Sequence, residues 1–472
     1  MSLSRRRFLS QSAAVTTAFS GLLKFTAGTA HSAGTAASKY GELVADPLRI
    51  FDLPAGFSYK IIGRAGDYMD DGLRMPGRTD GMGAFPAPDG KTVLVRNHEL
   101  ESHKTYQGPF GLQNELLEKI DPGLIYDAGQ KIAPHIGGTT TVVYDTKTKT
   151  VERQFLSLVG TCRNCAGGPT PWGTWITCEE TVERIAGSDP GDTDNKNEKD
   201  HGYNFEVPAT GEPALTKPVP LTAMGRFYHE AIAVDPATGI VYQTEDRHDA
   251  LFYRFVPTEK GNLQAGGKLQ AMAVDGPPPA RPDRGFDTRN WPDSKDTFAP
   301  LTPAPVRWID IDDIDNPGDD LRKRGFALGA ARLARSEGIW HGEGEFYIAC
   351  TNGGKKQYGQ ILRYRPSPAE GTPAETTNPG TLEIFVEPND KTLLQGADNL
   401  TVAPWGDVIV VEDGPKDARI HGISPDGGIY KIGRNEYNSS ELAGVCVSPD
   451  GTTLFVNIYD PGITLAITGP WA

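Results

Sequence analysis

The chain has 472 residues, of which 61 are acidic and 47 are basic, so its formal net charge is −14. No basic stripe is present to neutralise phosphates, which argues against nucleic acid as a partner. The excess of acid still permits an anionic substrate where bound cations cover the site. Apolar residues with helical spacing are scarce beyond the N-terminus, and 55 glycines and 37 prolines separate short β-rich runs. The sequence therefore predicts an all-β fold.

The N-terminus has the features of an export signal. The run SRRRFL at residues 4–9 matches the twin-arginine pattern, and an apolar stretch follows over residues 13–23. We predict a twin-arginine signal peptide over residues 1–37, recognised by the twin-arginine translocation machinery, and a periplasmic or extracellular mature protein. Later segments are too polar to span a bilayer, so we expect no membrane association of the mature form.

A turn-strand unit recurs along the rest of the chain. A Pro-x-Gly turn or a variant of it leads into a short strand, and acidic or amide side chains follow. The copies lie at residues 88–99, 171–180, 236–246 and 404–413, with weaker copies at 342–352 and 449–457. Repetition at long, irregular intervals is typical of a β-propeller, in which equivalent strand ends converge near the axis. The repeat predicts one propeller domain over residues 40–472 and a carboxylate-rich, metal-binding centre.

Three other segments carry structural expectations. Residues 188–200 and 276–295 are rich in polar residues, and the second also in proline, which predicts surface insertions. The acidic part of the first lacks the glycine and the closing glutamate of an EF-hand, so we predict a solvated loop there. Residues 112–120 form the one stretch inside the body that we predict to be helical.

The chain contains five cysteines, Cys162, Cys165, Cys178, Cys350 and Cys446, and this odd number leaves at least one without an intrachain partner. Cys162 and Cys165 form a C-x-x-C pair. A second pair with zinc spacing does not follow, so we do not expect a structural zinc site of that kind. Cys350 and Cys446 lie in apolar runs and are predicted to be buried.

Oxygen-bearing side chains dominate the candidate site. The strand ends and the His-containing motifs contribute Glu99, Glu179, Glu180, Glu230, Glu245, Glu412 and Asp413. Arg335 and Glu337 are two residues apart, so on a strand they would face the same side. Carboxylates suit calcium, magnesium, manganese and ferric iron, and the added thiol of Cys165 points to a redox-capable metal. The Arg335 guanidinium is suited to hold phosphate oxygens.

In several motifs the sequence resembles the PhoX family of alkaline phosphatases. The matching segments, in order, are residues 164–168, 171–175, 178–180, 225–230, 244–247, 335–338, 398–400, 404–407, 412–414 and 441–451. They span nearly the whole predicted mature chain. The resemblance implies a six-bladed propeller, twin-arginine export, and hydrolysis of phosphate monoesters at a site that combines ferric iron with calcium.

The resemblance also implies roles for individual residues. Cys165 matches an iron-ligating thiolate, and Arg335 matches a phosphate-contacting arginine with Asn164 beside it. Acidic positions at the metal cluster are matched by Glu99, Glu180, Glu245, Glu337 and Glu412. We expect the protein to be a monomer.

Two alternatives remain open on sequence grounds. One is a calcium-dependent propeller hydrolase of another class, such as a lactonase, which needs no thiolate. The other is a non-catalytic propeller that binds ligands and shows no turnover. Retention of metal and activity after Cys165→Ser would help to separate these alternatives from the phosphatase.

Overall fold

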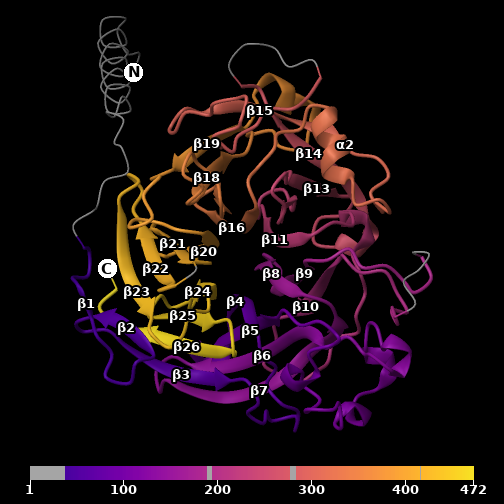
Figure 1. The fold of residues 1–472 in the computed structure, drawn as a ribbon, viewed down its shortest axis with the longest axis vertical. Coiled ribbons are helices and arrows are strands. Elements are labelled where there is room, and N and C mark those ends of the chain that lie inside the picture. The colour runs from indigo at the N-terminus through magenta and orange to yellow at the C-terminus, as the bar shows by residue number, and fades with distance from the viewer. Residues whose placement is uncertain (1–37, 189–193, 277–282, 415, 472) are drawn as a thin grey trace, which may run out of the picture.

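The computed structural model describes residues 38–188, 194–276, 283–414 and 416–471. The predicted signal peptide, residues 1–37, lies outside the described residues. The described strands surround a central axis (Figure 1). Among these residues, the helices are all too short or too polar to cross a membrane.

Five antiparallel sheets contain the described strands. The first two sheets, in spatial order, are β4 (Thr79–Pro86), β5 (Thr92–His98), β6 (Gly137–Asp145) and β7 (Thr150–Thr161), then β10 (Asn204–Pro208), β9 (Thr174–Glu179) and β8 (Asn164–Pro169). Two further sheets are β24 (Leu442–Val447), β25 (Thr453–Ile458), β26 (Ile463–Thr468) and β3 (Ser58–Arg64), then β1 (Leu43–Val44), β2 (Phe51–Pro54), β23 (Ile429–Asn435), β22 (Arg419–Ile423), β21 (Val408–Glu412) and β20 (Ala397–Val402).

The fifth sheet joins two meanders. Its order is β11 (His229–Val234), β12 (Val241–Glu245), β13 (Tyr253–Pro257), β14 (Gly267–Val274), β15 (Ala304–Asp310), β19 (Thr381–Val386), β18 (Gln360–Arg365), β17 (Glu345–Cys350) and β16 (Ser336–Gly342). The predicted all-β class is confirmed, and the arrangement is propeller-like.

The two ends of the described chain meet in one sheet. Strand β3 pairs with β26, with Ser58 opposite Thr468 and Arg64 opposite Ile463, and the two strands lie side by side in Figure 1. A sheet shared by the beginning and the end of the chain closes the ring, which removes the open flank that an unclosed stack of sheets would expose.

The repeated turns of the sequence are equivalent hairpins. Each joins an axial strand to the next strand of its sheet, as β8 to β9 and β20 to β21. The glycines that close these two turns, Gly173 and Gly406, have φ angles of 82° and 90°. Residues other than glycine rarely adopt such positive φ angles. The glycine of the Pro-x-Gly pattern is therefore required by the backbone conformation of the hairpin.

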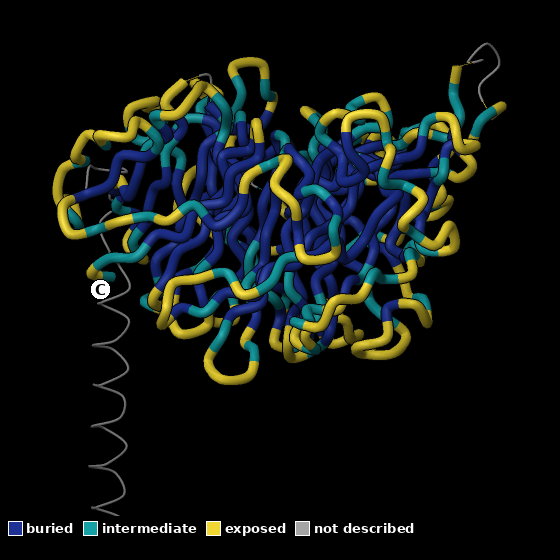
Figure 2. Tube along the Cα trace, turned by 90° about the horizontal axis from the view of Figure 1, so that it is seen from below, coloured by how far each residue is buried: buried dark blue, intermediate teal, exposed yellow. Residues whose placement is uncertain are grey.

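The strands are buried, and the loops that join them are exposed (Figure 2). Trp175 on β9 is 1% exposed and packs in a cluster with Phe85 and Phe205 from the neighbouring strands. Its indole Nε1 donates to Asn97 Oδ1 at 2.9 Å, and Asn97 Nδ2 donates to the carbonyl of Cys165 at 3.1 Å. The packing between two sheets thus fixes the backbone of Cys165.

The helix predicted over residues 112–120 is wrong. Only a 3-10 turn, Leu117–Lys119, forms there, because Asn114 takes a left-handed φ of 59° and interrupts the stretch. A helix forms instead at α2 (Leu321–Ala327). The described parts of the two predicted insertions are residues 188, 194–200, 276 and 283–295, and they contain no helix or strand. The second is not purely a surface loop, since Phe286 is buried in the core.

Candidate metal centre

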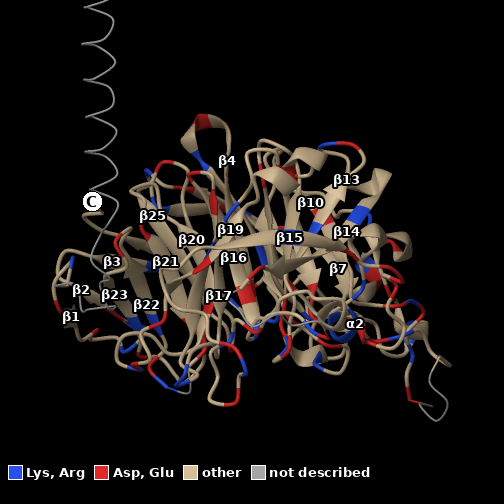
Figure 3. Ribbon diagram, turned by 90° about the horizontal axis from the view of Figure 1, so that it is seen from above, with Lys and Arg blue, Asp and Glu red and all other residues tan. Residues whose placement is uncertain are grey.

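A polar pocket of about 170 Å³ lies at one end of the axis. Nine carboxyl groups, two guanidinium groups and one thiol line this axial pocket: Asp80, Glu99, Glu180, Glu230, Asp246, Glu337, Asp398, Asp413, Glu441, Arg163, Arg335 and Cys165. On the outer loops, acidic and basic residues are interspersed (Figure 3). The axial pocket differs because its nine acidic side chains outnumber its two basic ones.

Five residues of the axial pocket lie in β-bulges near the start of axial strands. The bulges, seen as register shifts against the next strand, carry Asp80 on β4, Cys165 on β8, Glu230 on β11, Glu337 on β16 and Asp398 on β20. A bulge adds an unpaired residue and re-aims its side chain. The same local feature, a β-bulge, therefore directs a carboxyl or thiol side chain into the axial pocket from five strands.

A second set of pocket acids follows directly after the neighbouring strands. Glu99 follows β5, Glu180 follows β9, Asp246 follows β12 and Asp413 follows β21. These are the strands of the predicted turn-strand units, so the prediction that their acidic ends converge is correct for these four residues.

Glu245, a predicted metal ligand, does not line the axial pocket, although Asp246 does. It is the last residue of β12 and is fully buried. Its Oε2 accepts hydrogen bonds from the amide of Leu251 and the hydroxyl of Tyr253, both at 3.1 Å. Adjacent residues of an extended chain point to opposite sides, so Glu245 supports the loop after β12 while Asp246 faces the pocket.

Glu412 and Asp413 repeat this arrangement at the end of β21. Glu412 Oε1 accepts from the amide of Gln395 at 2.8 Å and contacts His421 Nε2 at 2.9 Å, away from the pocket, which Asp413 lines. The prediction of an acidic residue from each of these two strand ends in the pocket is correct. It named Glu245 and Glu412, whereas Asp246 and Asp413 line the pocket.

Asn164, predicted to lie beside Arg335, is buried outside the axial pocket. Its Nδ2 donates to Thr177 Oγ1 at 2.9 Å and its Oδ1 accepts from Thr161 Oγ1 at 2.6 Å. It immediately precedes Cys165, which faces the pocket, so the structure does not bring Asn164 and Arg335 together.

The other predicted site residues do meet. Cys165, Glu99, Glu180, Glu337 and Arg335 all line the axial pocket. Sequence analysis named Glu230 and Asp413 as candidate oxygen donors without giving them a specific role, and it assigned no site role to the other members, which are Asp80, Arg163, Asp246, Asp398 and Glu441. The signal that they share is position, in or just before an axial strand or one residue beyond a repeated strand.

Arg335 is held rigidly within the axial pocket. Its Nε and Nη2 donate to the two oxygens of Asp246 at 2.9 Å each, and Nη2 also donates to Glu337 Oε1 at 2.8 Å. The nearest described carboxylate to Nη1 is Asp413, at 4.0 Å. The bidentate pair fixes the guanidinium plane and leaves Nη1 as a donor for a further ligand.

Arg163 is the second cation. Its Nη2 lies 2.9 Å from Glu99 Oε1 and also contacts Glu180. Its side chain is 32% exposed and that of Arg335 is 27% exposed, so both guanidinium groups reach solvent. An anion that enters the axial pocket can therefore meet two arginines.

The carboxyl groups are crowded beyond what two arginines can neutralise. Burial raises the pKa of Glu180 to about 8, opposed by Arg163 and reinforced by Glu99 and Asp246. Burial and neighbouring carboxylates also raise the pKa of Glu230 far above its ordinary value. Buried like charges of this density ionise together only where cations accompany them, so the donor set fits bound metal ions.

Two groups of potential ligand atoms share one residue. Cys165, Glu180 and Glu230 offer atoms within 4.8 Å of one another, and so do Glu230, Glu337 and Asp398. Glu230 Oε2 lies 3.0 Å from the Cys165 sulfur. Glu230 belongs to both groups, so the residues could hold two ions, one with Cys165 among its ligands and one with carboxylate ligands only.

Comparison with known proteins gives one family match and one similar fold. A family model described as alkaline phosphatase PhoX matches residues 38–149 and 135–462. The structure of Pseudomonas fluorescens PhoX in complex with vanadate, a transition state analogue, superposes with a TM-score of 0.65 at 18% identity, over 92% of this chain and 97% of that chain.

More distant structures resemble the chain only weakly. A gluconolactonase from Xanthomonas campestris has a TM-score of 0.40 at 12% identity, over 92% of this chain and 99% of that chain. A protein of unknown function from Dyadobacter fermentans has a TM-score of 0.46 at 9% identity, over 88% of this chain and 100% of that chain. These scores are too low to carry an argument about the site. None of the curated proteins matches the sequence.

Proposed function

Because the chain belongs to the PhoX family of alkaline phosphatases, we propose that its axial pocket hydrolyses phosphate monoesters outside the cytoplasm. The observation that carries the proposal is the convergence of nine carboxyl groups and one thiol around two arginines. Such a set gathers cations, and cations together with arginines bind and polarise a phosphoryl group.

We assign the metals by donor type. Cys165, Glu180 and Glu230 would hold a ferric ion, because a thiolate favours a transition metal, and Glu230, Glu337 and Asp398 would take part in binding calcium. Bound in this way, the ions would supply Lewis-acid stabilisation of the phosphoryl oxygens and an activated oxygen nucleophile. Glu99 adds a further carboxylate to the lining of the same pocket.

Arg335 is the residue to which we assign phosphate binding. Asp246 holds its Nε and Nη2 at 2.9 Å, so the guanidinium is oriented before the substrate arrives. Its Nη1 can donate to a phosphate oxygen and neutralise charge that develops as the ester bond breaks. Arg163 can contact the same phosphoryl group, since it is held by Glu99 and Glu180.

Asn164, Glu245 and Glu412 receive supporting roles. Asn164 fixes the turn before Cys165 through Thr161. Glu245 and Glu412 accept backbone hydrogen bonds behind the two strand ends that present Asp246 and Asp413. We infer that they keep the ligands in place without touching metal or substrate.

The same proposal extends to architecture and location. The meanders β11–β14 and β16–β19, which β15 links, count as two blades beside the other four sheets, which supports six blades in a single domain. The axial strands β4, β8, β11, β16, β20 and β24 contact one another in sequence around the ring. Export by the twin-arginine route, removal of residues 1–37 and a monomeric state complete the hypothesis.

The test is turnover of a chromogenic phosphate monoester at alkaline pH, with calcium and with a chelator. We expect calcium-dependent hydrolysis, and Arg335→Gln should lower kcat by roughly 10²–10³. Arg307→Gln is the matched control, because Arg307 is half exposed on β15 and pairs with Asp275. Absence of turnover from folded, metal-loaded protein would refute the phosphatase, and lactone hydrolysis or ligand binding without turnover would support an alternative.

A further inference from the structure

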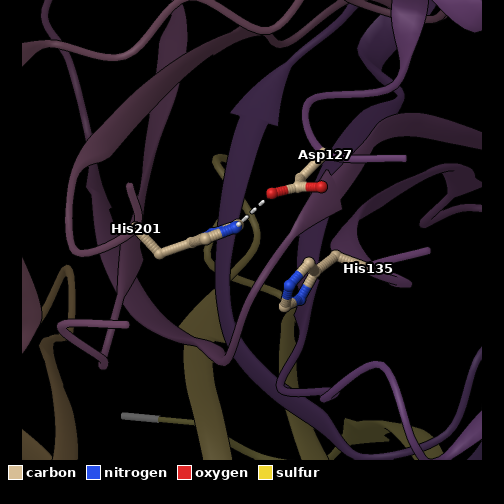
Figure 4. Close-up of side chains that lie close together, drawn as sticks. All are labelled: Asp127, His135 and His201. Atoms are coloured by element: carbon tan, nitrogen blue, oxygen red, sulfur yellow. Dashed lines mark hydrogen bonds and ion pairs between the residues drawn. The ribbon is translucent and has the colours of Figure 1, made fainter. Parts of the chain in front are cut away.

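A second cluster of metal-ligating side chains lies outside the axial pocket. Asp127 and His135 come from the long connection between β5 and β6, and His201 comes from the connection between β9 and β10. All three are at most 1% exposed. Potential ligand atoms of the three lie within 4.8 Å of one another, and Figure 4 shows His135 beside the bonded pair of His201 and Asp127. These three residues are called the outer cluster.

His201 is oriented as a metal-binding histidine usually is. Its Nδ1 lies 2.7 Å from Glu179 Oε1, and its Nε2 lies 3.2 Å from Asp127 Oδ2. A carboxylate on one ring nitrogen fixes the ring and its tautomer and leaves the other nitrogen for an ion, as in carboxylate–histidine–metal arrangements. Here that other nitrogen faces Asp127 Oδ2, so an ion at this position would take the place of the proton between the two side chains, which would leave to solvent.

His135 offers a buried lone pair. Its Nε2 lies 2.9 Å from Asn197 Oδ1, and Asn197 Nδ2 donates to Glu183 Oε2 at 3.1 Å and to the carbonyl of Arg184 at 3.3 Å. These donations place the amide oxygen toward His135, so Nε2 carries the ring proton and Nδ1 of the neutral ring carries the lone pair. Within the described residues, this Nδ1 has no hydrogen-bond partner.

An unpartnered nitrogen at this depth is costly unless something binds it. The ring of His135 stands beside that of His201, with their centroids 4.3 Å apart. Two imidazoles and one carboxylate are a nitrogen-rich donor set that suits Zn²⁺ and similar ions, whereas calcium takes oxygen ligands. The outer cluster therefore differs in kind from the axial pocket.

We propose that Asp127, His135 and His201 form a binding site for a divalent transition-metal ion, of which Zn²⁺ fits the donor set best. The ion would join the connection that carries Asp127 and His135 to the one that carries His201. Glu179, which orients His201, directly precedes Glu180 of the axial pocket. Metal at the outer cluster would thus hold the strand end that presents Glu180, without being part of the phosphatase chemistry.

The decisive experiment is X-ray absorption at the zinc edge on the full-chain protein, stripped with chelator and reloaded with one equivalent of ZnCl₂. We expect a zinc shell with two imidazoles in the wild-type protein. His135→Gln should remove one imidazole and weaken zinc binding by more than about tenfold. Cys165→Ser is the matched control, because it alters the axial pocket and should keep both imidazoles.

A zinc shell of oxygen and sulfur alone in the wild type would overturn the proposal, and so would equal zinc affinity in His135→Gln. If that variant does not fold, the wild-type spectrum still decides. Asn197→Ala removes the partner of His135 but leaves the three proposed ligands in place, so it should weaken zinc binding less than His135→Gln does. None of these readouts depends on turnover, so failure here and failure of the phosphatase proposal are distinguishable.

Discussion

Buried carboxylates are stabilised differently beside the outer cluster and in the axial pocket. The adjacent residues Glu179, which contacts the outer cluster, and Glu180, which lines the axial pocket, show the difference. Glu179 accepts hydrogen bonds from the amides of Cys162 and Gly202, both at 2.8 Å, and contacts His201. Burial alone would raise its pKa, but His201 and these amides hold it below its ordinary value. Glu180, one residue on, is buried among other acids, and its pKa rises to about 8.

The protein thus supplies a counter-charge for Glu179 in the side chain of His201. In the axial pocket, bound cations must supply most of the counter-charge. Around the outer cluster, contact with Glu179 and Asp127 outweighs burial and raises the pKa of His201 to about 9. At the axial pocket, Arg163 and Arg335 face nine carboxyl groups. Glu179 and His201 therefore stabilise each other before any ion binds, whereas the axial pocket is complete only with cations.

The largest expected effect concerns Glu230, which belongs to both candidate ligand groups of the axial pocket. Glu230→Ala should abolish measurable phosphatase turnover and lower the content of both metals, because each ion loses the shared ligand. Asp398→Asn touches only one group, so it should lower calcium content and retain iron. Metal analysis and turnover of the two purified variants check this. Equal loss of both metals in Asp398→Asn would break the assignment of two distinct positions.

The next effect separates Glu179 from Glu180 by the sign of a stability change. In chelator-treated protein, Glu179→Gln should lower the free energy of unfolding by about 3 kcal/mol, because it removes one partner of a buried pair and leaves His201 poorly compensated. Glu180→Gln should leave that free energy unchanged or raise it, because it removes one of several like charges. Denaturant unfolding measures both. The same sign for the two variants would contradict the comparison.

The smallest effect concerns the acidic pair at the end of β21. Glu412→Gln should keep the turnover of the folded protein near that of the wild type, because Glu412 bonds to the amide of Gln395 and to His421 behind the pocket. Asp413→Asn alters a pocket wall 4.0 Å from Arg335 and should lower turnover more. Assays normalised to folded protein check the order. A larger loss of turnover in Glu412→Gln than in Asp413→Asn would indicate that Glu412 is a metal ligand after all.

Much of the scaffold could be predicted from local sequence. The Pro-x-Gly turns encode a backbone that few other residues adopt, as at Gly173 with its φ of 82°. That local requirement is visible without tertiary information. The false helix at residues 112–120 shows the limit, because a left-handed φ of 59° at Asn114 interrupts a stretch whose residue types favour a helix.

The candidate site could be predicted only in part. Arg335 and Glu337 were expected on one side of a strand, and Nη2 donates to Oε1 at 2.8 Å. The choice between Glu245 and Asp246 was missed, because neighbouring acids on a strand differ only in the side that they face. Asp80 and Asp398 were missed because a β-bulge is a property of the pairing between two strands.

The sequence by itself determined the all-β class, the repeated hairpins and the family, since these depend on short motifs and on composition. Only the tertiary structure decided which carboxylates meet and which are neutralised. Residues far apart in the chain, such as Asp80 and Glu441, become neighbours of the same axial pocket when the ring closes. The pKa of a buried acid is set by what surrounds it in space, so Glu179 and Glu180 differ although they are the same residue type side by side.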